Sequence, residues 1–441
     1  MREELAMNGG SPVVPGALKR RWPDIRSEDK AAVLAVLDRG ELTGIDGVEA
    51  TSLESEWAGR LGVAHAVLFN SGTAAIHAAL YAVGVQAGDE VITTAFTFSG
   101  TFQAVLHQGA IPIFVDIDPV TYNMDPGLIE ARITPRTRAL LPVHIHGMPC
   151  DMDKIMEIAA RHKLVVVEDA AQAHLATYRG RFVGTIGQAG AFSVQATKNF
   201  SGIEGGFVVT DDAAVADRAR SIRTYGEDVA AGSDLGGWYF RPYTVFSVGW
   251  NYRSNELSAA FARSQLRRLD EYTEIAQRNG RYLGQALARI PGIIPPTEPQ
   301  GRTSVFHKYR VRFDVKRLGV NVPPVVFRDR LVAALRAEGV DALLWHTEPV
   351  TSFPIFRTRE GFGRGYPWSL APGSGVIDPA EYRNAIDLLK SSIIVCDEFH
   401  PIMIQPLELM EAYAAAFAKV LREPRALLAD KGSSLVGTPT R

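Results

Sequence analysis

Lys198 is the residue of this chain that is best placed to do chemistry, because the glycine-rich segment 201–206 that follows it would let a loop press closely against a ligand. A lysine alone in a loop is usually a solvated surface residue, so a functional role for Lys198 must be inferred from the residues around it. Asp169 ends an apolar run that begins at Val165, and Ser193 precedes the lysine on an expected strand. A lysine that condenses with an aldehyde cofactor needs a carboxylate that keeps a pyridine nitrogen protonated and a donor that helps to hold a phosphate. These residue types therefore predict a site for pyridoxal 5'-phosphate.

A candidate phosphate site lies at Asn70-Ser71-Gly72-Thr73-Ala74, between an expected strand and an expected helix. The free backbone N–H groups and the dipole at a helix N-terminus attract phosphate, while Gly72 permits close approach and Thr73 adds a hydroxyl. The same segment could instead form a simple helix N-cap, and Asp169 allows the same alternative for the helix that follows it. On these residues alone both interpretations stay open.

Two further side chains could contact the ring of the cofactor. Gln172 lies three residues after Asp169, close enough within a turn to reach the 3-oxygen of the ring. Phe98, in the segment Ala95-Phe96-Thr97-Phe98-Ser99, could cover the pyridine face by offset stacking. An aromatic residue at this position could equally belong to the hydrophobic core.

Other kinds of catalytic site find less support. His144 and His146 are two residues apart on an expected strand, with no matching cluster of cysteine and histidine nearby, so we expect no metal site. Ser193 lacks the surrounding glycines of a nucleophile elbow, which argues against a serine hydrolase.

The composition is that of a globular protein, with 46% hydrophobic and 22% charged residues. A formal net charge of −2 gives no electrostatic case for nucleic acid or for an anionic membrane surface. The two cysteines, Cys150 and Cys396, cannot form a disulfide framework and suit a reducing compartment. No N-terminal run resembles a signal peptide, and no apolar stretch is long enough to span a bilayer. We therefore expect a cytoplasmic protein.

The elements that must position these residues alternate between short apolar strands and helices. Strands are expected at residues 66–69, 90–94, 111–115, 140–144 and 164–168, with glycine-containing turns and helices between them. Such alternation predicts an α/β fold with a mostly parallel central sheet flanked by helices. Ligands of these sheets bind at the carboxyl ends of the strands, which is where the polar motifs fall.

Four parts of the chain are expected. Prolines interrupt any helix in residues 1–27, which we expect to form an N-terminal arm. Residues 28–265 are expected to form the large domain that binds the cofactor. A long helical stretch over 256–287 leads from it into a smaller C-terminal α/β domain over 266–424. The polar tail 425–441 is expected to be disordered.

Taken together, the motifs resemble those of the DegT/StrS family of sugar aminotransferases that depend on pyridoxal 5'-phosphate and have the fold-type I architecture. The resemblance extends from about Trp22 to Leu421. The motifs that carry it are Asn70-Ser71-Gly72-Thr73, Thr97-Phe98, Glu168-Asp169-Ala170-Ala171-Gln172, Ser193-Val194-Gln195-Ala196-Thr197-Lys198, Gly202-Ile203-Glu204-Gly205-Gly206 and Gly249-Trp250-Asn251-Tyr252-Arg253.

The resemblance implies a role for each matched residue. Lys198 corresponds to the lysine that forms an imine with the cofactor, and Asp169 to the partner of the pyridine nitrogen. The remaining matches are Gln172 for the 3-oxygen, Phe98 for the ring face, and Gly72, Thr73 and Ser193 for the phosphate. Asn251 matches an asparagine that reaches the phosphate of the neighbouring subunit, so a homodimer is implied.

The implied reaction moves an amino group from glutamate or glutamine to a cyclic ketone by a ping-pong mechanism, in aminosugar or other secondary-metabolite biosynthesis. One departure bears on the ketone: Gln195 and Ala196 stand where many family members have an aromatic residue and a proline. This feature, together with Arg21-Trp22-Pro23, is similar to the branch that acts on keto-cyclitols and to aminohydroxybenzoate synthases.

Two alternatives remain. One is a lyase that removes a hydroxyl group from a keto-sugar on the same scaffold, although members of that branch carry histidine in place of Lys198. The other is a regulatory protein that binds the cofactor without turnover, for which no helix-turn-helix or basic segment gives support. The segments Trp345-His346 and Tyr366-Pro367-Trp368 match no motif of known role.

Overall fold

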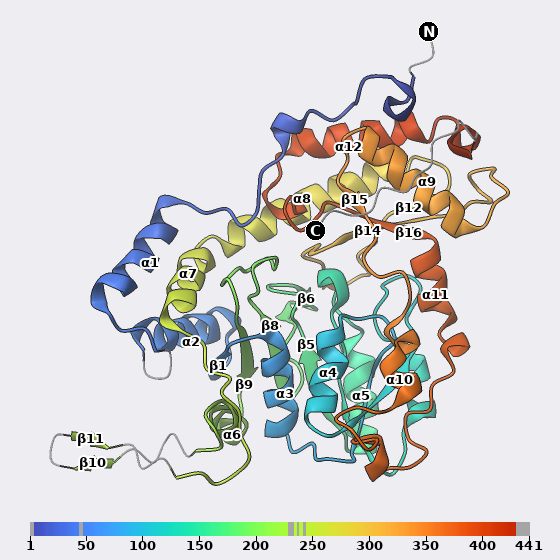
Figure 1. The fold of residues 1–441 in the computed structure, drawn as a ribbon. Helices are drawn as coiled ribbons and strands as arrows, with labels where there is room; N and C mark the ends of the chain where they lie inside the picture. Colours follow the sequence, from blue (N-terminus) through green and yellow to red (C-terminus); the bar gives the residue numbers. More distant parts are fainter. Residues whose placement is uncertain (1–3, 44–46, 228–232, 236–237, 241–243, 429–441) are drawn as a thin grey trace.

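The computed structural model describes residues 4–43, 47–227, 233–235, 238–240 and 244–428 of the 441-residue chain. The larger part is built on a seven-stranded sheet with helices on both faces (Figure 1). Its strands run in the order β1 (His65–Phe69), β9 (Gly206–Thr210), β8 (Ala189–Ser193), β5 (Val165–Asp169), β4 (Thr137–Leu140), β2 (Glu90–Thr94) and β3 (Ile111–Val115). Only β9 runs antiparallel to its neighbours β1 and β8, so the predicted mostly parallel sheet is confirmed.

Both faces of this sheet are covered, which explains why its strands read as continuous apolar runs. Successive side chains of a strand point to opposite faces. Val166 accordingly packs toward α2, α5 and α7, whereas Val167 packs toward α3, α4 and α6. These helices are α2 (Val48–Leu61), α3 (Gly72–Ala82), α4 (Ser99–His107), α5 (Met152–His162), α6 (Ala213–Arg223) and α7 (Glu256–Leu266).

The expected strand over 140–144 is wrong in its bounds, because β4 is Thr137–Leu140. Pro142 has no N–H to donate to a sheet ladder. Beyond it the chain turns into the short 3-10 helix Ile145–Gly147, and Val143 keeps only an isolated bridge to Asp169.

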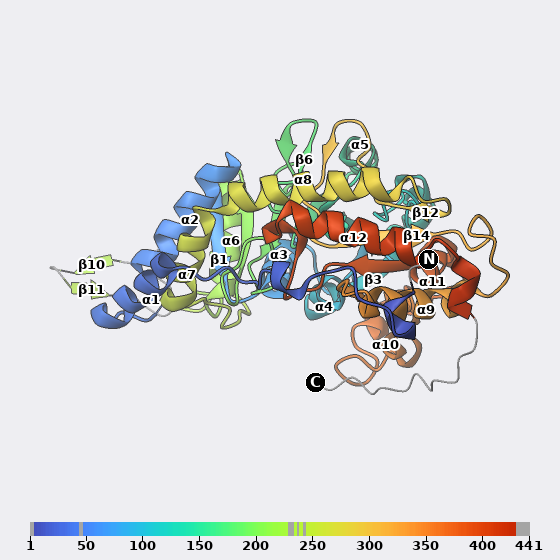
Figure 2. The ribbon, with the colours of Figure 1, turned by 90° about the horizontal axis from the view of Figure 1, so that it is seen from above.

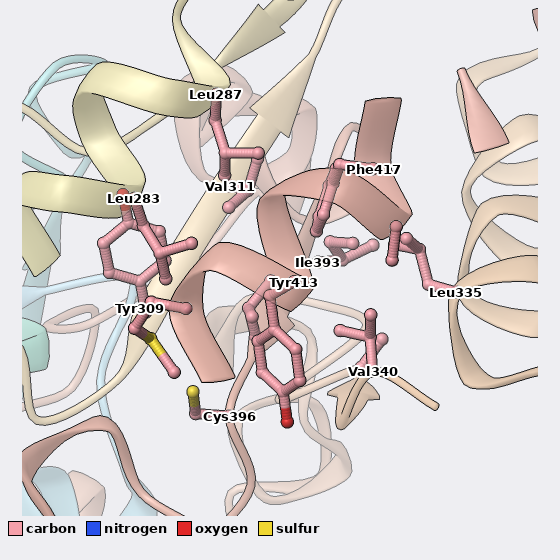
Figure 3. Close-up of a cluster of buried hydrophobic side chains, with 14 of the residues drawn as sticks. Leu283, Leu287, Tyr309, Val311, Leu335, Val340, Ile393, Cys396, Tyr413 and Phe417 are labelled. Atoms are coloured by element: carbon pink, nitrogen blue, oxygen red, sulfur yellow. The ribbon is translucent and has the colours of Figure 1, made fainter. Parts of the chain in front are cut away.

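The smaller part carries an antiparallel sheet in the order β12 (Ile293–Ile294), β14 (Tyr309–Phe313), β16 (Ser392–Val395) and β15 (Ala342–Leu343). Helices α8 (Leu269–Leu287), α9 (Pro324–Ala337) and α12 (Leu407–Val420) pack on it. Figure 3 shows the apolar cluster between them, in which Leu283 and Leu287 of α8 lie close to Tyr309 and Val311 of β14.

The remaining elements are short or peripheral. They are α1 (Ser27–Arg39), α10 (Pro354–Thr358), α11 (Arg383–Lys390), the strands β13 (Arg302–Thr303), β6 (Thr177–Tyr178) and β7 (Arg181–Phe182), which form one small sheet, and the pair β10 (Ser233–Leu235) and β11 (Trp238–Phe240). No helix of the described residues combines the length and apolarity that a membrane span requires.

The single helical stretch expected over 256–287 is interrupted. Helix α7 ends at Leu266 and α8 begins at Leu269, and the intervening Arg268 leaves the helical conformation. Its guanidinium is buried and donates to the Asp29 carboxylate of α1 at 2.8 Å. We attribute the break to this tertiary contact, since the local sequence contains no proline or glycine there.

The chain before α1 lies against the smaller part of the molecule, as Figures 1 and 2 show. Backbone N–H groups of Ala6 and Val13 donate to the buried carboxylate of Glu338, which follows α9. At the other end of the chain, residues 425–428 belong to the 3-10 helix Pro424–Leu428, in which Leu427 is buried. The rest of the tail for which disorder is expected, 429–441, lies outside the described residues.

Candidate active site

A cavity of about 390 Å³ opens beside the carboxyl ends of β5 and β8. Its other wall comes from the smaller part of the molecule, which contributes His307, Lys308, Trp345 and Glu398. Seven of the eight predicted site residues line it, namely Gly72, Thr73, Phe98, Asp169, Gln172, Ser193 and Lys198. Residues that are more than a hundred positions apart in the sequence therefore meet at one place.

The N-terminus of α3 faces this cavity with its first turn. Ser71 is the N-cap, and its hydroxyl accepts from the backbone N–H of Ala74 at 3.1 Å. Gly72 and Thr73 follow at the first helical positions, where a backbone N–H group has no hydrogen-bond acceptor within the helix. The capping and ligand-binding interpretations are therefore compatible, because different residues serve each.

Gly72 and Ser193 are packed so closely that no side chain fits between them. A Cβ atom at Gly72 would lie 2.5 Å from the Cβ of Ser193. Glycine at this position brings the end of β8 against the start of α3. The Ser193 hydroxyl thereby joins the helix N-terminus in a cradle that suits a phosphate group.

Asp169 is held at the end of β5 by two hydrogen bonds. Its Oδ2 accepts from the Thr101 hydroxyl at 2.7 Å, and its Oδ1 accepts from the Ala171 N–H at 3.1 Å. Because the Thr101 hydroxyl donates its one proton to the carboxylate, Thr97 must be the donor in the 2.6 Å hydrogen bond between the Thr97 and Thr101 hydroxyls. Burial raises the pKa of Asp169, and both hydrogen bonds act against that rise. A cationic N–H in the cavity would lower it further.

Lys198 is partly buried at the cavity wall. Burial lowers the pKa of its amine to about 8, with a further contribution from the positive charge of Lys308, while Asp169 and Glu398 oppose the shift. An amine in this state is partly neutral near neutral pH, which a nucleophilic or proton-accepting lysine requires.

Gln172 and Phe98 both line the cavity. The Gln172 Oε1 accepts from the His146 backbone N–H at 2.8 Å, so its amide Nε2 is the end that remains as a donor to a ligand. Phe98 is 53% exposed, whereas Phe96 two residues earlier is 1% exposed. The alternative that Phe98 belongs to the core is therefore wrong.

Asn251 is the one predicted site residue that does not line the cavity of its own chain. It is exposed, its Oδ1 accepts from the Arg253 Nε at 2.9 Å, and its carbonyl accepts from the Asn70 amide at 3.3 Å. Its contribution to a neighbouring subunit stays a prediction.

His144 and His146 both have protein partners. His144 pairs through Nε2 with Glu168 at 3.0 Å, and its Nδ1 accepts from the Cys150 N–H. The His146 Nε2 accepts from Arg310 at 3.1 Å. These contacts give the two histidines structural roles.

The sequence predicted no role for any residue of the second wall of the cavity, although Trp345 belongs to a segment that matched no known motif. Lys308 immediately precedes β14, in which apolar Tyr309 and Val311 alternate with arginines. That alternation would ordinarily indicate a solvent-exposed face, yet Lys308 and Arg310 are both buried. The signal that could have found them is a run of closely spaced cations next to His307 in a strand of an α/β enzyme.

The segment before α1 also reaches the loop between β8 and β9 that carries Lys198, the lysine loop. The Trp22 indole N–H donates to the Ala196 carbonyl at 2.7 Å, and the Trp22 backbone N–H donates to the Phe399 carbonyl. The Trp22 side chain is buried and packs edge-on against Tyr272. One residue thus connects the lysine loop with the smaller part of the molecule.

The model of the DegT/DnrJ/EryC1/StrS aminotransferase family matches residues 23–369, well over half of the chain. A putative L-glutamine:3-amino-2,3-dideoxy-scyllo-inosose aminotransferase of Streptoalloteichus tenebrarius is 39% identical over 358 residues, which cover 80% of this chain and 82% of that protein. The spore coat polysaccharide biosynthesis protein SpsC of Bacillus subtilis is 40% identical over 77% of this chain and 85% of its own length.

Among solved structures, the chain is similar to 3-amino-5-hydroxybenzoic acid synthase, with a TM-score of 0.79 and 28% identity. The alignment covers 92% of this chain and 99% of that one. The fold-type I architecture expected from the motifs is therefore confirmed.

Proposed function

This chain belongs to the DegT/DnrJ/EryC1/StrS aminotransferase family, whose members depend on pyridoxal 5'-phosphate, and we propose that it transfers an amino group from glutamine or glutamate to a cyclic ketone. The observation that carries the proposal is the meeting of Lys198, Asp169 and the α3 N-terminus in one cavity. Each of the three supplies what a different end of the cofactor requires.

The residues present fit this cofactor. The cradle formed by the α3 N-terminus and the Ser193 hydroxyl, which the close contact of Gly72 with Ser193 brings together, would take the phosphate together with Thr73. Asp169 would hold the pyridine nitrogen, and the Gln172 amide would contact the 3-oxygen. When bound, pyridoxal 5'-phosphate supplies an aldehyde that can accept an amino group and a ring that withdraws electrons.

The side chains around the ring divide the remaining work. The Lys198 amine, with its pKa lowered to about 8, can take up or deliver a proton at Nζ near neutral pH. Asp169, fixed by Thr101 and Ala171, would keep a ring nitrogen protonated with an orientation set before substrate arrives. Phe98 would cover one face of the ring and exclude water from it.

For the acceptor we propose a keto-cyclitol or a related ring. Gln195 supports this choice, because it stands where many family members have an aromatic residue and it lines the cavity. The relative from Streptoalloteichus tenebrarius, a putative aminotransferase of an amino-dideoxy-scyllo-inosose, supports the same choice. The similar identity to SpsC makes a sugar of a surface polysaccharide the second candidate.

We also propose a homodimer in which Asn251 serves the site of the neighbouring subunit. Its exposure supports this proposal, as does the group of exposed apolar side chains nearby at Val245, Phe246 and Val248. Exposed apolar surface of this kind is typical of an interface.

The test is an absorbance spectrum of the protein loaded with cofactor, recorded before and after addition of L-glutamine or L-glutamate without any ketone. We expect the donor to convert the visible band to that of the pyridoxamine form, and ketone added afterwards to restore it. Lys198→Ala should show neither change at a useful rate. A visible band that neither donor discharges in the wild-type protein would contradict transamination and favour the lyase.

A further inference from the structure

We propose that Lys308 is the residue that binds the α-carboxylate of the amino donor, with Glu398 as an internal partner that the carboxylate displaces. The proposal rests on the proposed function, since it assumes an amino acid as donor. It assigns a second anion site to the cavity, separate from the cradle at the α3 N-terminus.

The first support is where the ammonium lies. Lys308 is 9% exposed and lines the same cavity as Lys198, from the opposite part of the molecule. A donor must bring its amino group to the Lys198 side, and its α-carboxylate is attached to the same carbon as that amino group. A cation on the facing wall of a cavity of about 390 Å³ is therefore within reach of the carboxylate.

The second support is that the ammonium is incompletely paired. A lysine ammonium has three N–H donors. Within the described residues, the Lys308 ammonium donates to one protein oxygen, the Glu398 Oε1, at 3.1 Å. Glu398 is 47% exposed on its side chain, so water weakens this pair, and the carboxylate can swing away at small cost.

The third support lies behind Lys308. Arg310 is 2% exposed, and its guanidinium donates to the His146 Nε2, to the Ser392 hydroxyl at 2.7 Å and to the Trp345 carbonyl at 2.9 Å. None of these three groups is an acid. The charge of Arg310 is thus uncompensated by its direct partners and adds a positive potential under this wall, which favours an incoming anion.

Trp345 completes the arrangement. The Lys308 Nζ lies 5.6 Å from the centre of the Trp345 ring, and that ring also lines the cavity. The ring holds the ammonium by a cation–π contact without neutralising its charge. A donor carboxylate would therefore meet a fixed and partly desolvated cation.

The experiment uses glutaramate, which is glutamine without its amino group, so it keeps the α-carboxylate but cannot react. Its binding to cofactor-loaded protein is measured by calorimetry for the wild type, Lys308→Met and Lys316→Met. Lys316 is an exposed lysine of the same part of the molecule and controls for the change in net charge. We expect Lys308→Met to weaken binding about tenfold or more, the usual consequence of removing a charged hydrogen-bond partner, and Lys316→Met to leave it unchanged.

Glu398→Gln provides an independent variant with the opposite expected sign. It leaves Lys308 in place but removes the competing carboxylate, so glutaramate should bind about threefold more tightly. Equal affinities for the wild type and Lys308→Met would overturn the proposal, as would weaker binding to Glu398→Gln.

Two further readings separate the possible failures. If Lys308→Met lost affinity for pyridoxal 5'-phosphate and kept its affinity for glutaramate, the ammonium would belong to the cofactor and the proposal would fall. The half-reaction is measured in the same variants with L-glutamine and with 4-aminobutanamide, which lacks the carboxylate. Lys308→Met should slow the half-reaction with L-glutamine and leave the half-reaction with 4-aminobutanamide unchanged. Absence of any half-reaction in the wild type would instead refute the proposed function, while the binding of glutaramate would still report on Lys308.

Discussion

Burial is the largest influence on the Lys198 amine, and it acts before any cofactor is bound. It lowers the pKa to about 8, and Lys308 adds to the shift while Asp169 and Glu398 oppose it. An ordinary lysine titrates near pH 10.4, so within a cavity of this kind the amine becomes reactive at a pH about two units lower. The surroundings, and not the residue type alone, prepare it for chemistry.

This leads to a prediction for the cofactor-free protein. The rate at which an amine reagent labels Lys198, followed by mass spectrometry, should rise with pH around a midpoint near 8. In Lys308→Met the midpoint should move to higher pH, because the positive charge of Lys308, one of the two causes that lower the Lys198 pKa, is removed. A midpoint near that of an exposed lysine such as Lys316 in the same sample would contradict the assignment.

The same shift has a consequence for stability. Between about pH 8 and pH 10.5 the unfolded chain binds more protons at Lys198 than the folded chain does, so the free energy of unfolding rises with pH in this window. Below pH 8 the cost of the buried charge is fully present. Lys198→Met should therefore stabilise the cofactor-free protein at pH 7, and its advantage should shrink as the pH rises through the window.

At the scale of elements, the site depends on how closely β8 approaches the start of α3. Gly72→Ala would place a Cβ atom 2.5 Å from the Cβ of Ser193, and one of the two elements must move. We expect a loss of about 1–3 kcal/mol in the free energy of unfolding, as for other overpacked positions, and weaker cofactor binding.

Gly59→Ala is the matched control, since Gly59 lies within α2 and an added Cβ atom there meets nothing within 4 Å. Alanine in a helix interior should stabilise the protein by about 0.5–1 kcal/mol. Urea unfolding and titration with cofactor measure both effects. Equal behaviour of the two variants would show that the contact between Gly72 and Ser193 is not what shapes the cradle.

The break between α7 and α8 rests on a second contact between elements. The Asp29 carboxylate of α1 is 1% exposed and accepts from the Arg268 guanidinium at 2.8 Å and from the Arg26 N–H at 2.7 Å. Arg268→Met would leave that carboxylate buried without its cation, at a cost of about 3–5 kcal/mol. Arg267→Met removes an exposed arginine one position away and should have little effect. Thermal melts of the two variants give the comparison, and equal melting temperatures would show that the buried pair contributes nothing to stability.

At the scale of the whole molecule, the cavity belongs to both parts of the chain. The lysine loop is connected to the smaller part by Asn199, which donates to the Val305 carbonyl at 3.0 Å and pairs with the His307 Nδ1 at 2.9 Å. Trp22 adds a third attachment from the segment before α1. Movement of one part relative to the other would therefore change the setting of Lys198 directly.

The proposed dimer predicts complementation between two defective variants. If Asn251 serves the site of the neighbouring subunit, a mixed dimer of Lys198→Ala and Asn251→Ala contains one site in which both residues are intact. Unfolding and refolding the two variants together should restore activity that neither shows when refolded alone. A mixture no more active than its parents would contradict the shared site.

The sequence by itself determined the side of the cavity that comes from the parallel sheet. Gly72, Asp169, Gln172, Ser193 and Lys198 each follow or end a short apolar strand. Because the carboxyl ends of parallel strands share one edge, locating each residue at a strand end was enough to predict that they meet. Local patterns of this kind survive in the sequence because they are set by neighbours only a few residues away.

Only the tertiary structure decided the other wall and the break in the long helix. Lys308 and Arg310 alternate with apolar residues as a solvent-exposed strand face would, and their burial arises because another part of the chain covers them. Arg268 lies outside the helical conformation and donates to the Asp29 carboxylate, which is about 240 positions earlier in the chain. Such contacts leave no periodic signal, since their energy comes from groups that folding brings together from distant positions.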